Sequence, residues 1–116
     1  MDAPPLPPAG GPSPRVRLAQ LARDAALATP GVVDLDAGPA GTFFTAGGGT
    51  RIKGVTCSTA PEGGFDVSLR LVCELAPLYA VADRVRVAVE SAATEARLIV
   101  QSVTITIADL AVPQGA

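Results

Sequence analysis

The segment from Phe65 to Leu75 alternates between apolar and polar side chains, and this alternation restricts the fold more than any other part of the sequence. In a β-strand, successive side chains point to opposite faces of the sheet. A strand with one apolar and one polar face belongs to a sheet that is covered on one side, so any helices are expected to pack on that side. The apolar face comprises Phe65, Val67, Leu69, Leu71 and Cys73, and the polar face Asp66, Ser68, Arg70 and Glu74.

Two helices are predicted from apolar residues at helical spacing. The first begins at Ser13, whose side-chain oxygen can cap free N–H groups, with Pro14 in its first turn, and it ends at the Pro30-Gly31 pair. The second begins at Pro77. Their apolar stripes are Leu18, Leu21, Ala22, Ala25 and Ala28 in the first, and Leu78, Val81, Val85, Ala88, Val89 and Ala92 in the second.

Three further strands are expected, at 32–35, 51–59 and about 99–109. The sequence Pro-Glu-Gly-Gly at 61–64 predicts a hairpin turn before the alternating strand. The irregular start of the last strand indicates a bulge or a change of burial. The order is helix, strand, strand, strand, helix, strand. It predicts an α+β two-layer sandwich, with a sheet of about four strands and two helices on one face.

The chain of 116 residues is long enough for one domain, which we expect at 13–112. Residues 1–12 hold five prolines and two glycines, which predicts a disordered tail, and 113–116 are expected to be loose. The glycine-rich segment 37–50 is interpreted as a flexible connector. Its Gly-Gly-Gly-Thr ending lacks the lysine and the following helix that a phosphate-binding loop requires.

Composition argues against several classes of function. The chain has no histidine, which removes histidine-based acid–base chemistry and most zinc sites, and two cysteines are too few for a structural zinc site. The net charge is −2 and the basic residues form no cluster, so no nucleic-acid partner is expected. We therefore predict no catalytic residue, no cofactor and no metal.

Membrane signals are also missing from the sequence. No apolar run approaches the roughly 18 residues of a membrane span, and the acidic, proline-rich start does not resemble a signal peptide. We expect a cytoplasmic protein without direct membrane insertion. Any link to the membrane would pass through another protein.

Cys57 and Cys73 are predicted to be buried free thiols. In a hairpin centred near Gly63, the two cysteines are offset by about 13 Å along the strands. A disulfide needs Cα atoms less than roughly 7 Å apart. A reducing cytoplasm agrees with this interpretation.

Five segments, taken in order, resemble the alkaline shock protein family. They are the first helix and its "P-G-V" turn at 17–33, the "K-G-V" strand opening at 53–55, the alternating strand at 65–74, the second helix at 77–92 and the closing strand at 103–107. The sequence departs from the family pattern at Ala28, where an acid is common, and at Ala76 and Ala96, where glycine is common.

The resemblance implies a role in cell envelope homeostasis and the envelope stress response of Gram-positive bacteria. It also implies self-association and a membrane-anchored protein partner, with no catalytic residues. Our preferred hypothesis is therefore a non-enzymatic protein–protein interaction module. The alternative is a small-ligand binding or regulatory domain whose glycine-rich loop closes over a metabolite. An enzyme that uses Asp34, Asp36 or Asp66 ranks third.

Candidate interaction residues are Phe43, Phe44, Tyr79 and Val87. The two phenylalanines either close the end of the core or form an exposed anchor, and closure is favoured. Val87 is expected on the outer half of the second helix with Tyr79. Together with Leu27 or Val16 on the outer side of the first helix, it could form an oligomer contact, although a lone exposed valine needs no such explanation.

Overall fold

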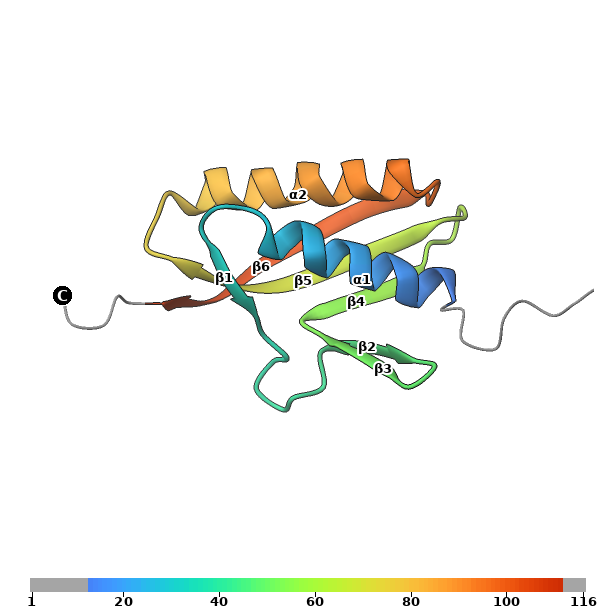
Figure 1. The fold of residues 1–116 in the computed structure, drawn as a ribbon, viewed down its shortest axis with the longest axis horizontal. Helices are drawn as coiled ribbons and strands as arrows, with labels where there is room; N and C mark the ends of the chain where they lie inside the picture. The colour runs from blue at the N-terminus through green and yellow to red at the C-terminus, as the bar shows by residue number, and fades with distance from the viewer. Residues whose placement is uncertain (1–12, 112–116) are drawn as a thin grey trace, which may run out of the picture.

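A computed structural model describes residues 13–111, so the tails expected at 1–12 and 113–116 lie outside the described residues. The observed elements largely follow the predicted order, with two more strands than predicted (Figure 1). They are α1 (Pro14–Leu27), β1 (Val32–Leu35), β2 (Phe44–Gly47), β3 (Thr50–Lys53), β4 (Val55–Thr59), β5 (Phe65–Glu74), α2 (Leu78–Glu95) and β6 (Val100–Ala111).

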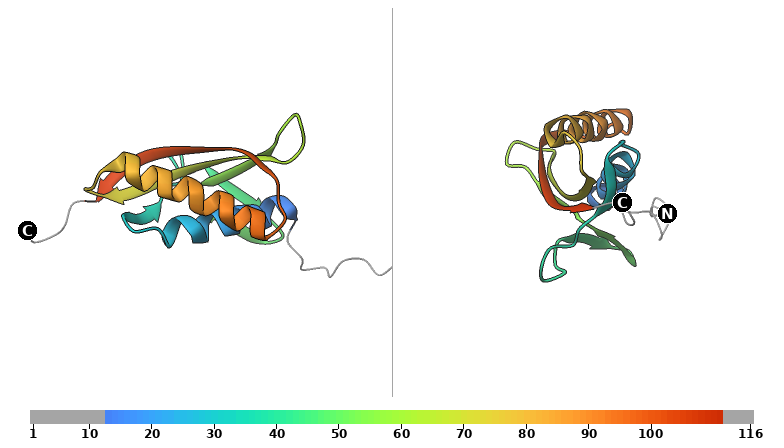
Figure 2. Two further views of the ribbon diagram at one scale, coloured as in Figure 1. Left: turned by 90° about the horizontal axis from the view of Figure 1, so that it is seen from above. Right: turned by 90° about the vertical axis from the view of Figure 1, so that its left-hand side faces the viewer.

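The α+β two-layer prediction is confirmed. The main sheet has four strands, and Figure 2 shows α1 and α2 side by side on one side of it. The alternating strand β5 is central. β6 pairs with one of its edges in parallel, and β4 and β1 pair with successive parts of the other edge in antiparallel orientation. Because β5 and β6 are parallel, α2 serves as the crossover between them.

The core lies between this sheet and the two helices and is built from small aliphatic side chains. From β5 it takes Val67, Leu69 and Leu71, and from α2 Val81, Val85 and Val89, all of which are buried. Cys57 and Cys73 are free and buried, as predicted. Cys57 lies opposite Val67 on β5, whereas Cys73 belongs to the far end of that strand. The two thiols are therefore separated along the sheet.

The segments at 37–50 and 51–59 differ from the prediction. Instead of one strand at 51–59, the structure has β3 and β4, and β3 forms a second, two-stranded sheet with β2. The break falls at Gly54, whose φ is +79° and whose added Cβ would lie 2.5 Å from the Cβ of Leu35. Gly48 and Gly49, both with positive φ, connect β2 to β3. Part of the expected connector is thus a hairpin.

This hairpin explains an error in the burial pattern of α1. Val16 was expected on the outer side of the helix, but it is only 2% exposed. Its Cγ2 lies 2.8 Å from where a Cβ of Gly47 would be, so the β2–β3 hairpin covers it. Ala28, in contrast, is exposed at the end of the helix. The predicted helix start is confirmed, since the Ser13 side chain accepts a hydrogen bond from the Val16 amide.

The irregular start of β6 is also confirmed. Phe65 lies opposite Val100 and Asp66 opposite Ser102, so one residue of β6 is extra at this point. The pairing is then regular from Asp66 to Leu71. A second shift follows near the end of the strand, where Asp109 lies opposite Val72.

Candidate functional site

β6 is the longest strand, and only one of its edges is used. Within residues 13–111 it pairs with β5 alone, so its second edge has no strand partner. An unpaired edge presents a row of backbone donors and acceptors to which another extended chain can add. Natural edge strands are usually protected by lysine, proline, charged residues or a short length. The stretch 100–108 has no charged residue and no proline.

The hydrogen bonds of β5 show which residues of β6 point toward this free edge. The amide of Arg70 donates to Gly54, on the β4 side, so the odd-numbered residues of β5 face β6. The Phe65 amide, which donates to the Ile99 carbonyl, agrees with this assignment. In a parallel pair, a residue bonds to the neighbours of the residue opposite it, which itself points away. The residues opposite Val67, Leu69 and Leu71 are Val103, Ile105 and Ile107.

The backbone N–H and C=O groups of Val103, Ile105 and Ile107 therefore point to the free edge, and their side chains point to the helix layer. These side chains are only partly buried, whereas Leu69 and Leu71, next to them on β5, are 0% exposed. Because α2 covers β5 more completely than β6, an apolar strip remains open along the edge of the sheet.

A groove lies along this strip. It has a volume of about 230 Å³ and is lined mostly by apolar atoms. Tyr79, in the first turn of α2, forms one of its walls and is 95% exposed. The other lining residues are Leu78 and Ala82 from α2 and Ile105 and Ile107 from β6. We call the free edge of β6 together with this groove the β6 edge site.

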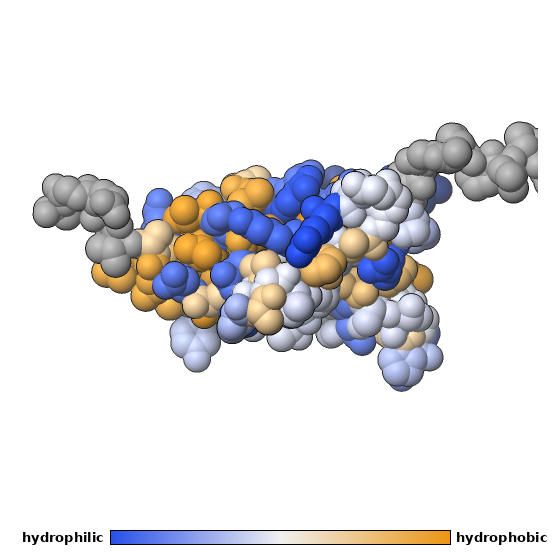
Figure 3. Space-filling model, turned by 90° about the horizontal axis from the view of Figure 1, so that it is seen from below, coloured by the Kyte–Doolittle hydropathy of each residue, from blue (hydrophilic) through white to orange (hydrophobic). Residues whose placement is uncertain are grey.

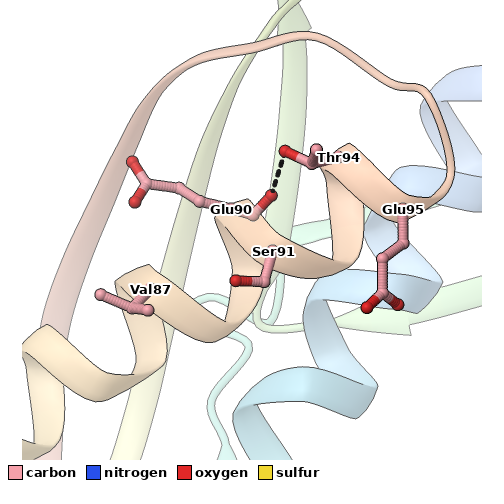
Figure 4. Close-up of a pocket in the computed structure, with 5 residues that line it drawn as sticks. All are labelled: Val87, Glu90, Ser91, Thr94 and Glu95. Carbon is pink, nitrogen blue, oxygen red and sulfur yellow. Dashed lines mark hydrogen bonds between the residues drawn. The ribbon is translucent and has the colours of Figure 1, made fainter.

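Val87, another predicted site residue, lies elsewhere on α2. It is 49% exposed and borders an open depression of about 370 Å³ on the outer face of the helix (Figure 4). The depression is lined otherwise by Glu90, Ser91, Thr94 and Glu95. The Thr94 hydroxyl donates to the Glu90 carbonyl at 2.9 Å, within the helix. This depression is a shallow part of a solvated helix face.

Phe43 and Phe44 do not close the core, and the favoured interpretation of this pair is wrong. Neither packs against the core cluster, and both are half-buried. The Arg51 guanidinium lies 4.0 Å from the ring centre of Phe44, and that of Arg70 lies 5.8 Å from the ring centre of Phe43. The alternation of β2 directs Thr45 to the interior instead, where its hydroxyl donates to the Val55 carbonyl.

The four predicted residues therefore do not form one surface. Phe43 and Phe44 belong to the region of the β2–β3 hairpin, and α2 lies on the other side of α1 (Figure 1). Only Tyr79 contributes to the β6 edge site. The edge role of Val103, Ile105 and Ile107 was not predicted. The available signal was the uncharged, β-branched run at 103–107, which suits an edge that is meant to be covered.

The three aspartates considered for catalysis are engaged in surface contacts. Asp34 pairs with Lys53 at 3.3 Å, and Asp66 accepts from the Ser102 hydroxyl at 2.7 Å. Asp36 accepts from the Gly38 amide at 2.9 Å and from Arg70 at 3.1 Å. These two contacts, the amide first, lower the pKa of Asp36 below its usual value.

The thiols lie in the apolar interior. Burial raises the pKa of Cys57 to about 11, and it also raises the pKa of Cys73. A nucleophilic cysteine needs the opposite shift, toward the thiolate. Both cysteines are therefore packing residues of the sheet.

An apolar surface lies at the end of the sheet where β5 and β6 finish. Val33, Leu75 and Leu110 are exposed there. Figure 3 shows apolar surface gathered toward the end of the molecule that leads to the C-terminus.

Within residues 13–111, no group of three or more acidic or cysteine side chains is placed to hold a metal ion. Neither helix of this part of the chain is long and apolar enough to cross a bilayer.

Comparisons of the chain with protein-family models, with curated proteins and with solved structures find no match.

Proposed function

We propose that this protein is a non-enzymatic interaction module that binds other protein chains through the β6 edge site. The observation that carries the proposal is the combination of two features at one place. The free backbone groups of Val103, Ile105 and Ile107 can extend the sheet by one strand, and the adjoining apolar groove can receive side chains of that strand. Strand addition obtains its affinity from the backbone bonds and its specificity from such pockets.

The other described residues support a binding function rather than catalysis. The candidate acids are held by Lys53, Arg70 and Ser102, and both thiols are buried with raised pKa values. The core is filled by aliphatic side chains. No observation favours a metabolite site under the glycine-rich segment, because Gly47 belongs to β2 and Gly48 and Gly49 form the turn of the β2–β3 hairpin.

The cellular role follows from the sequence resemblance alone. We propose a cytoplasmic module of cell envelope homeostasis that is active in the envelope stress response, self-associates and reaches the membrane through an anchored protein partner. The support is the ordered series of motifs from the first helix to the closing strand.

Photo-crosslinking in the native host tests this function. A photoreactive residue at position 79, inside the β6 edge site, is compared with one at position 17, an exposed position on α1. We expect protein adducts from position 79 that are absent from position 17 and that include a protein of the membrane fraction. Equal labelling from both positions, or no protein adduct from position 79, would contradict the proposal.

A further inference from the structure

The β6 edge site could receive different extended chains. One of them is the β6 strand of a second copy, which can pair with β6 about a two-fold axis. Resting on the proposed function, we infer that a second copy of this chain binds there, with the two β6 strands antiparallel and centred on Ile105. The result is a two-fold dimer in which one continuous sheet runs through both copies.

The register follows from the three residues whose backbone groups point outward. A two-fold axis at Ile105 places Ile105 opposite itself and Val103 opposite Ile107 of the other copy. Residues with outward N–H and C=O groups form the hydrogen-bonded pairs of an antiparallel ladder, so all three residues are used in both copies. A shift by two residues would leave one outward residue of each copy without such a partner.

Side chains on the helix side fit the same register. Val103 of one copy comes to lie next to Ile107 of the other and thus beside the groove of about 230 Å³. Tyr79, which is 95% exposed in the single chain, covers this contact from the α2 side. Cross-strand pairs of β-branched residues are favourable in antiparallel sheets.

Charge permits the pairing of identical strands. Like charges directly opposite each other destabilise a sheet. In this register, the one acid of β6, Asp109, falls opposite the neutral Gln101 of the other copy, and the residues between them are uncharged. A closed two-fold contact of this kind also uses up the edge, so it ends in a dimer and not in a fibre.

The area buried in the dimer can be estimated from the length of β6. The 12 residues of β6 extend over about 40 Å. With one strand spacing and the flank of one helix, the strip is about 15 Å wide, which gives roughly 600 Å² from each copy. The total of about 1,200 Å² is at the lower end of the range for stable interfaces. Interfaces at this end of the range are typical of weak complexes, so we expect a dimer that dissociates on dilution.

Analytical ultracentrifugation between 1 and 500 μM tests the dimer. We expect a monomer–dimer equilibrium that Tyr79→Glu weakens at least tenfold without lowering the melting temperature, because the Tyr79 side chain is solvent-exposed in the monomer. Ile105→Pro removes an outward N–H and should also weaken it at least tenfold. The control Arg17→Glu adds a negative charge at an exposed position on α1 and should leave the equilibrium unchanged.

Disulfide trapping tests the register. Residues opposite each other in a hydrogen-bonded pair have Cα atoms about 5.5 Å apart, which suits a disulfide. Ile105→Cys should therefore give a covalent dimer on mild oxidation. Ile107→Cys alone should not, because the two copies of that position would be about 14 Å apart. A mixture of Val103→Cys and Ile107→Cys chains should cross-link again.

A chain that stays monomeric at 500 μM overturns the inference, as does a dimer that is insensitive to both Tyr79→Glu and Ile105→Pro. Equal cross-linking from Ile105→Cys and Ile107→Cys overturns the register. These results concern the purified chain only. The proposed function fails separately, when a photoreactive residue at position 79 captures in cells no protein other than a second copy of this chain.

Discussion

At the scale of single residues, Arg97 is the clearest place where the sequence is not ideal for its structure. Arg97 is the only non-glycine among residues 13–111 with a positive φ, at 60°. It follows the C-terminal cap of α2, where its amide donates to Thr94 and the Leu98 amide donates to Ala93. This pair of bonds is the Schellman motif, whose left-handed position is usually a glycine.

Arg97→Gly should therefore stabilise the protein by about 1 kcal/mol, since glycine adopts the left-handed conformation without steric cost. Urea denaturation of both proteins measures the difference. Arg84→Gly, on the exposed surface of α2, is the control and should destabilise by about 1 kcal/mol. A loss of stability from Arg97→Gly would show that the backbone at this position is not strained.

Cys57 makes the free energy of unfolding depend on pH in the alkaline range. Its pKa is about 11 in the folded chain, against an ordinary value of 9.0. Between these values the unfolded chain loses the thiol proton and the folded chain keeps it, so stability falls as pH rises through this window and is unaffected below it. The contribution falls by at most about 1.4 kcal/mol per pH unit.

The measurement is the free energy of unfolding of the wild type minus that of Cys57→Ala, from pH 7 to 11. We expect this difference to stay constant up to about pH 9 and to shrink above it. Other groups that titrate at high pH are common to both proteins and cancel. A difference that stays constant up to pH 11 would mean that the thiol is not shielded from water.

At the scale of elements, sequence patterns predicted the helices and strands that are determined by residues close together in the chain. The cap at Ser13 and the alternation of β5 are local signals, and α1, α2, β5 and the irregular start of β6 were predicted from such signals. The β2–β3 hairpin is also local, with Gly48 and Gly49 as its turn, but its glycine-rich sequence was interpreted as a connector. The break between β3 and β4 was not predicted, because it depends on Gly54 fitting against Leu35, which is distant in sequence. The burial of Val16 was missed for the same reason.

Gly54, at the break between β3 and β4, should tolerate substitution less than the other glycines of this region. Gly54→Ala would place a Cβ 2.5 Å from that of Leu35 and 2.9 Å from the Asp36 nitrogen. We expect a loss of at least 3 kcal/mol, about 1–2 from the left-handed backbone and the rest from the clash. Gly49 also has a positive φ, but a Cβ added there would meet nothing within 4 Å. Gly49→Ala should therefore lower the stability by only about 1–2 kcal/mol. Equal losses would contradict this account.

At the scale of the whole molecule, the two faces and two edges of the sheet have different roles. One face is covered by both helices, and β4 and β1 together occupy one edge of β5. The outer edge of β6, the longest strand, has no strand partner among residues 13–111, and three of its residues direct their backbone groups away from the fold. The candidate site was only partly predictable, because Tyr79 could be placed on the outer half of a helix, but the sheet order cannot be read from the periodicity of β6.

Residue-resolved amide hydrogen exchange, followed by NMR across protein concentration, tests the central claim most directly. In dilute protein, the amides of Thr104 and Thr106, which face β5, should be protected, while those of Val103, Ile105 and Ile107 exchange rapidly. At several hundred micromolar, the three outward amides should gain protection. Outward amides that are protected at every dilution, or that stay unprotected at every concentration, would contradict the account.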